Sequence, residues 1–117
     1  MDIGQEAALY IAPSAARAMC EAIAEAGADG TSREVFLAGK LDGQGLVSEV
    51  RVCARGHVSA VPAFLNALDS RDVVLHNHPS GDITPSEADI ELGAAFGCNG
   101  HGVYIVNDDV SRVYVVV

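Results

Sequence analysis

The sequence of 117 residues has no tryptophan and few basic side chains, and both shortages restrict the classes of protein to which it can belong. Seven Lys and Arg residues stand against sixteen Asp and Glu residues, which gives a formal net charge of −9. Affinity for nucleic acids comes largely from Lys and Arg side chains that neutralise phosphates, and anionic membranes attract proteins in the same way. We therefore expect this domain to make no direct contact with nucleic acid or with a membrane.

Cysteines and long apolar runs are also scarce. The three cysteines, Cys20, Cys53 and Cys98, are widely spaced and include no Cys-x-x-Cys pair, which is typical of reduced thiols rather than of a disulfide framework. The first residues lack the charged-then-apolar pattern of a signal peptide. No apolar run approaches the roughly 20 residues that a transmembrane helix needs. These observations predict a soluble, cytoplasmic protein.

Length and composition favour one domain over residues 1–117. A chain of this length can bury a single core but not two independent ones, and half of its residues are apolar. The sequence contains no internal repeat or linker, and its last residues form an apolar stretch. We expect a single domain, consistent with excision from a longer polypeptide.

Periodic patterns along the chain predict helices that flank a mixed sheet. Segments rich in helix-forming residues, with start or stop signals, predict helices at residues 13–26, 59–68 and 86–97. Alternating patterns and short apolar runs predict strands at residues 34–41, 46–55, 73–75, 103–106 and 113–117. The order of these elements favours the α/β fold class, with a mixed central sheet between helices.

The first predicted helix has two distinct faces. Apolar residues recur at intervals of three and four, and the predicted core face consists of Ala16, Met19, Cys20 and Ile23. The predicted solvent face carries Arg17, Glu21 and Glu25. This helix is therefore expected to cover one side of the sheet.

Two histidines, His76 and His78, follow the short apolar run at residues 73–75. On an extended backbone, residues i and i+2 point to the same side, so both imidazoles can reach one metal ion. Asp89 lies in the first turn of the next predicted helix, where the helix dipole favours a carboxylate. Two His and one Asp with an open fourth position are typical of a catalytic zinc site.

A hydrolytic zinc site also needs a base that accepts a proton from water. Glu34 stands at the start of a predicted strand, and a sheet can bring the end of that strand beside His76. Glu49 remains a second candidate for the base. Ser86 stands three residues before Asp89, which is typical of a helix N-cap in a capping box with Asp in place of Glu.

These residues and their spacing resemble the JAMM motif of the JAB/MPN metalloproteases. The motif reads Glu34, then His76-Asn77-His78, seven residues, Ser86, two residues and Asp89. Within that family, the residues from 76 to 86 and the stretch from 31 to 36 are most similar to the bacterial RadC-like branch. The resemblance covers nearly the whole chain and implies a cytidine-deaminase-like JAB/MPN fold.

The resemblance also implies a role for each residue of the motif. It implies that His76, His78 and Asp89 bind zinc, that Glu34 is the general base, and that Ser86 donates a hydrogen bond to the developing oxyanion. Active members of the family cleave peptide or isopeptide bonds next to ubiquitin-like or sulfur-carrier proteins. The implied partner is therefore a protein or peptide tail.

Two other functions stay open. A JAB domain without activity would act as a binding module that recruits a partner. The RadC-like residues also suggest an accessory domain of a DNA-repair protein, although the helix-hairpin-helix segment usual in that branch has no room before Pro13. Loss of activity with a chelator would distinguish an enzyme from a binding module, and salt-dependent DNA binding would support the accessory role.

Overall fold

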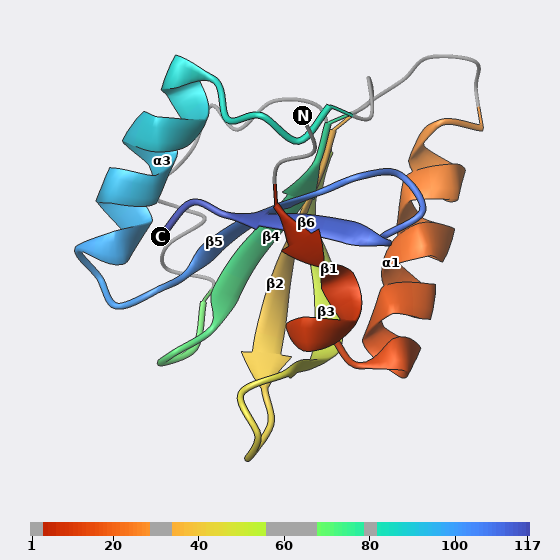
Figure 1. Cartoon of the computed structure of the whole chain (residues 1–117), viewed down its shortest axis with the longest axis horizontal. Helices are drawn as coiled ribbons and strands as arrows, with labels where there is room; N and C mark the ends of the chain where they lie inside the picture. The colour runs from red at the N-terminus through yellow and green to blue at the C-terminus, as the bar shows by residue number, and fades with distance from the viewer. Residues whose placement is uncertain (1–3, 29–33, 56–67, 79–81) are drawn as a thin grey trace.

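A six-stranded mixed sheet with helices on both sides forms the domain (Figure 1). The computed structural model describes residues 4–28, 34–55, 68–78 and 82–117. The strands are β1 (Gln5–Glu6), β2 (Val35–Leu41), β3 (Val47–Arg55), β4 (Val73–Asn77), β5 (Val103–Val106) and β6 (Arg112–Val115). The helices are α1 (Pro13–Ala26), α3 (Glu87–Gly97) and the short 3-10 turn η1 (Ala7–Leu9). The predicted α/β class and mixed sheet are confirmed.

The strand order is β1-β6-β5-β4-β2-β3. Neighbouring strands pair antiparallel except β4 and β5, which are parallel and are joined through α3. A parallel pair needs such a crossover, because the chain must return to the same end of the sheet before the second strand begins. The start of α3 therefore lies at the end of the sheet where β4 stops.

Most predicted elements agree with the structure to within two residues. The strand predicted at residues 73–75 continues through His76 and Asn77, so the first histidine of the motif is a strand residue. The two-residue strand β1 is absent from the prediction; it pairs with β6, and both of its residues are exposed. The helix predicted at residues 59–68 lies outside the described residues except for Leu68.

Helix α1 has the predicted bounds, but the residues on its buried face differ in part from those predicted. Met19 and Ile23 are buried as predicted, whereas Ala16 and Cys20 are only half-buried. The buried alanines of α1 are Ala15, Ala22 and Ala26. Alanine occurs on every side of this helix, so the sequence pattern does not distinguish the buried face from the faces next to it.

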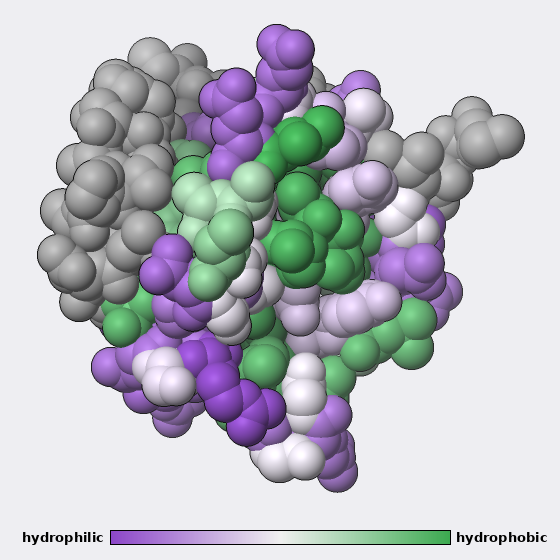
Figure 2. Space-filling view, turned by 90° about the vertical axis from the view of Figure 1, so that its left-hand side faces the viewer, coloured by the Kyte–Doolittle hydropathy of each residue, from purple (hydrophilic) through white to green (hydrophobic). Residues whose placement is uncertain are grey.

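Two hydrophobic clusters lie on opposite sides of the sheet. The larger one joins α1 to the sheet through residues such as Met19, Leu37 and Leu75. The smaller one lies on the α3 side and contains Phe36 and Phe96. The surface on that side mixes apolar and hydrophilic side chains (Figure 2). Neither described helix has the length and apolar character needed to cross a bilayer.

Candidate metal centre

The histidine pair lies at the carboxyl end of β4, in the interior of the sheet. His76 is paired with Phe36 of β2 on one side and with Ile105 of β5 on the other. Helix α3 begins at this same end, because β4 and β5 are parallel and α3 connects them. In α/β sheets, ligands commonly bind just outside the carboxyl ends of parallel strands. The fold thus brings the two histidines close to the start of α3.

His76 is a fully buried, neutral side chain. Its ring stacks on that of Phe36, with a centroid distance of 4.8 Å and an interplanar angle of 16°. Burial lowers the pKa of His76 from 6.5 to about 4, so the ring carries no charge at pH 7. Among the described residues, neither of its ring nitrogens has a hydrogen-bond partner. Because buried polar atoms are nearly always satisfied in native proteins, this ring has a nitrogen available for another ligand.

The orientation of His78 is fixed by a backbone carbonyl. Its Nδ1 lies 2.7 Å from the carbonyl oxygen of Asp82, so Nδ1 carries the proton and donates it to that oxygen. The Asp82 carboxylate in turn accepts hydrogen bonds from the backbone N–H and the hydroxyl of Thr84, at 3.0 and 2.7 Å. This tautomer leaves the lone pair of His78 on Nε2, as in metal-binding histidines. Sequence reasoning did not assign this role, although the Asp-x-Thr pattern is a signal for such a turn.

Asp89 presents its carboxylate to both histidines. Its Oδ1 lies 3.2 Å from Nε2 of His76, and its Oδ2 lies 2.9 Å from Nε2 of His78. Burial alone would raise the pKa of Asp89, but the hydrogen bond from the Ser86 backbone, together with positive charge on His76 and His78 when those rings are protonated, lowers it by more. The net pKa lies below 3.8, so the group is a carboxylate at neutral pH.

A capping box at the start of α3 holds Asp89 in this position. The Ser86 N–H donates to Oδ2 of Asp89 at 2.8 Å, and the Asp89 N–H donates to the Ser86 hydroxyl oxygen at 3.2 Å. Both halves of the predicted capping box are therefore present. The same short sequence that starts the helix also aims its carboxylate at the histidines.

The donor set fits a metal ion. The Nε2 atom of His78 and Oδ2 of Asp89 lie 2.9 Å apart, so they share a proton when Nε2 is protonated and can share a metal cation when it is not. In a tetrahedral zinc site with bonds of roughly 2.0–2.1 Å, neighbouring ligand atoms are about 3.3 Å apart. Each imidazole Nε2 lies within a few tenths of an ångström of that value from one oxygen of Asp89, at 3.2 Å from Oδ1 for His76 and at 2.9 Å from Oδ2 for His78.

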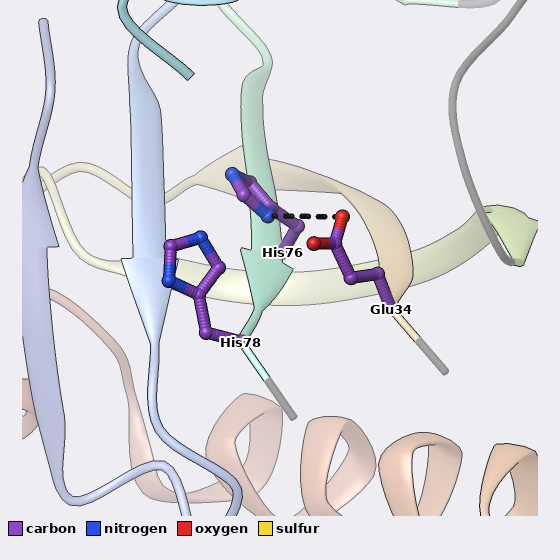
Figure 3. Close-up of side chains that lie close together, drawn as sticks. All are labelled: Glu34, His76 and His78. Atoms are coloured by element: carbon purple, nitrogen blue, oxygen red, sulfur yellow. Dashed lines mark ion pairs between the residues drawn. The ribbon is translucent and has the colours of Figure 1, made fainter. Parts of the chain in front are cut away.

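Glu34 lies on the other side of the His76 ring, immediately before β2. Its Oε2 is 3.8 Å from Nδ1 of His76, the contact marked in Figure 3. One ligand atom from each of Glu34, His76 and His78 lies within 4.8 Å of the others, a group that could hold a metal ion. Burial is the main cause that raises the pKa of Glu34; a positive charge on His78, present only when its ring is protonated, lowers this pKa, and the charge of Asp89 raises it further.

Glu49, the second candidate for the base, lies far from the histidines. It pairs with Lys40, four residues along β2 from Phe36, which is the partner of His76. At about 3.3 Å per residue, this displacement along the strand is roughly 13 Å. The fold therefore brings Glu34, and not Glu49, to this end of the sheet.

Acidification of the metal-free domain is expected to destabilise it through His76. The His76 side chain has a pKa of 6.5 in the unfolded chain, whereas in the folded protein burial lowers that pKa to about 4. Because the unfolded chain binds this proton more readily, the free energy of unfolding is unaffected by His76 above pH 6.5. It decreases as the pH falls from 6.5 to about 4, by about 3 kcal/mol at most. Urea unfolding of chelator-treated protein across this range measures the loss, and His76→Gln should show a shallower dependence on pH. An equal slope in the two proteins would contradict this account.

Comparison with known proteins identifies the family of this chain. The model of the family described as the RadC-like JAB domain matches residues 12–105. The UPF0758 protein SH1266 of Staphylococcus haemolyticus is 58% identical over 33 residues, which are 28% of this chain and 13% of that relative. That relative is therefore more than twice as long as this chain. With the family match extending from the start of α1 through most of β5, the chain belongs to the RadC-like JAB domain family.

Proposed function

We propose that this domain is a zinc-dependent hydrolase that cleaves a peptide or isopeptide bond. The observation that carries the proposal is the Asp89 carboxylate, whose two oxygens face Nε2 of His76 and Nε2 of His78 at 3.2 and 2.9 Å. Three donors, two imidazoles and one carboxylate, converge, and a second carboxylate, that of Glu34, stands close by, 3.8 Å from the nearest imidazole nitrogen. This division into three close donors and one nearby acid is the composition of a catalytic zinc site.

His76, His78 and Asp89 would hold the zinc ion. When bound there, zinc supplies Lewis acidity that polarises a carbonyl group and lowers the pKa of a coordinated water molecule. The protein contributes the geometry: the Asp82 carbonyl fixes the tautomer of His78, and the capping box orients Asp89. Stacking on Phe36 and burial within the sheet keep the ring of His76 in place.

Glu34 is the proposed general base. Its carboxylate lies 3.8 Å from the nearest ring nitrogen, a separation longer than a direct hydrogen bond. A raised pKa brings its proton affinity closer to neutrality, which suits a group that accepts a proton and then gives it to the leaving amine. Glu34 would therefore take the proton from the attacking water and deliver it to the nitrogen of the broken bond.

Ser86 is the proposed donor to the oxyanion. Its hydroxyl uses a lone pair, not its proton, to cap the helix, so the O–H remains a possible donor. The residue is exposed, and the Glu34 side chain is 36% exposed, so both are accessible from solvent. The expected substrate is a protein or peptide tail, such as that of a ubiquitin-like or sulfur-carrier protein.

Cleavage by the purified domain is expected to disappear on treatment with a chelator and to return on addition of zinc. The substrate panel should contain peptides and isopeptide-linked protein tails, because sequence and fold do not fix specificity in such sites. Magnesium is the control cation, since it prefers oxygen ligands and should not restore activity at a site with two imidazoles. A protein that binds zinc but cleaves nothing on the panel would favour the alternative of a binding module.

A further inference from the structure

The ladder between β2 and β4 ends beside the metal centre. Its last backbone pair is Phe36 with His76. One residue further on, the Val35 N–H donates to the side-chain Oδ1 of Asn77, at 2.7 Å and buried. A side chain therefore takes the place of the next backbone acceptor at the point where β2 begins.

The other end of the Asn77 side chain is also engaged. Its Nδ2 donates to Oδ1 of Asp108 at 3.1 Å, and the residue is only 1% exposed. The amide orientation is fixed, because only the oxygen can accept from an N–H and only the nitrogen can donate to a carboxylate. Asp108 belongs to the turn between β5 and β6. One buried amide thus ties three parts of the chain together.

These contacts hold the backbone next to Glu34. Side chains alternate between the two faces of a strand, so Asn77 points away from the side that carries His76 and His78. Val35 likewise points away from the side of Glu34. The Val35 N–H is part of the peptide group that joins it to Glu34, so its hydrogen bond fixes the plane from which the Glu34 side chain extends. Glu34 itself precedes the first residue of β2.

We infer that Asn77, the residue between the two histidines, is a positioning residue that places Glu34 beside His76. It acts through the Val35 peptide and through Asp108, on the side of the sheet opposite the metal centre. The inference rests on the proposed function for the role of Glu34 as a base. The geometric part, that Asn77 sets the position of Glu34, is independent of any reaction.

An exchange of the two hydrogen-bonding groups provides the test. Asn77→Ala removes the acceptor of the Val35 N–H, and Asn77→Asp places two carboxylates 3.1 Å apart. The double variant Asn77→Asp with Asp108→Asn restores a donor and an acceptor in reversed order. Asp108→Asn alone is the matched control, because its side-chain oxygen still accepts from Asn77. Turnover, zinc content and NMR exchange of the Val35 amide are measured for each variant.

We expect Asn77 substitutions to lower turnover without lowering zinc content, and the double variant to restore turnover. Asn77→Ala should speed exchange of the Val35 amide and lower kcat by about 10- to 100-fold, the range typical of outer-shell partners, with zinc content unchanged. The double variant should recover most of the loss seen in Asn77→Asp. An Asn77→Ala protein with unaltered amide exchange, or a double variant no better than Asn77→Asp, overturns the inference. A loss of zinc that parallels the loss of turnover also overturns the inference, because Asn77 would then act on the metal ligands and not on Glu34.

Failure of the proposed function can be told apart from failure of this inference. If the parent domain cleaves no substrate, nuclear Overhauser contacts between the Glu34 and His76 side chains replace turnover as the readout. These contacts should weaken in Asn77→Ala and return in the double variant. Contacts of equal strength in all variants would overturn the positioning role even in an inactive protein.

Discussion

Glu34→Gln is expected to lower turnover by about two to four orders of magnitude, the usual cost of losing a general acid–base group. The amide keeps the shape of the side chain but cannot take up a proton from water. Zinc content and stability should stay near those of the parent, because the Glu34 carboxylate lies 3.8 Å from the nearest imidazole nitrogen, whereas Asp89 contacts both rings. Steady-state kinetics on a substrate cleaved in a zinc-dependent way, together with metal analysis, measures both quantities.

Glu49→Gln is the matched control for this experiment. It makes the same chemical change on the neighbouring strand, opposite Lys40 and away from the histidines, and should leave turnover within a few-fold of the parent. Full activity in Glu34→Gln would remove Glu34 from the reaction. Loss of zinc in that variant would instead make Glu34 a ligand, in keeping with its membership of the Glu34, His76 and His78 group.

His78→Ala is expected to reduce bound zinc from about one ion per chain to nearly none after dialysis, because two remaining donors hold the metal too weakly. Nε2 of His78 is the donor nearest to Asp89, at 2.9 Å, and the Asp82 carbonyl aims it there. Activity should fall with the metal. Elemental analysis of the dialysed protein gives the occupancy, and thermal unfolding with and without added zinc shows whether the ion still stabilises the fold.

The control for removing an imidazole is His101→Ala. His101 is also largely buried, but its Nδ1 bonds to the carbonyl of Asp72 at the opposite end of β4. This variant should lose stability without losing zinc. Full zinc occupancy in His78→Ala would refute the assignment of His78 as a ligand.

Local signals in the sequence were sufficient for the elements that carry the centre. The start of α3 follows from Ser86 and Asp89 alone, because a capping box is a contact within four residues. Strand β4 was predicted too short, since its last residues are polar and buried polar strand ends do not follow an apolar pattern. Strand β1 has only two exposed residues, so its existence depends on β6 rather than on its own sequence.

The relation of Glu34 to the histidines could not be obtained from spacing. It depends on the antiparallel register that sets Phe36 opposite His76, and register is a property of the assembled sheet. The family resemblance supplied what the pattern lacked, by naming Glu34 as part of one motif. The contributions of the Asp82 carbonyl and of the Asn77 side chain are not part of the sequence prediction: the Asp-x-Thr pattern indicates a turn but not which residue its carbonyl contacts, and a buried amide has no distinctive sequence pattern.

The parts of this centre are brought together by chain closures of very different length. His78 and Asp89 are 11 residues apart, whereas the bond that anchors Glu34 joins Val35 to Asn77 across 42 residues. Closing the shorter loop costs about 1 kcal/mol less in chain entropy. During folding, His78 and Asp89 can therefore meet before β2 reaches β4, and if the centre binds zinc as proposed, we expect a partly folded chain to keep some affinity for the ion. Because a ligand that also binds the unfolded ensemble stabilises the native state less, zinc should raise the stability of this domain by less than its affinity implies.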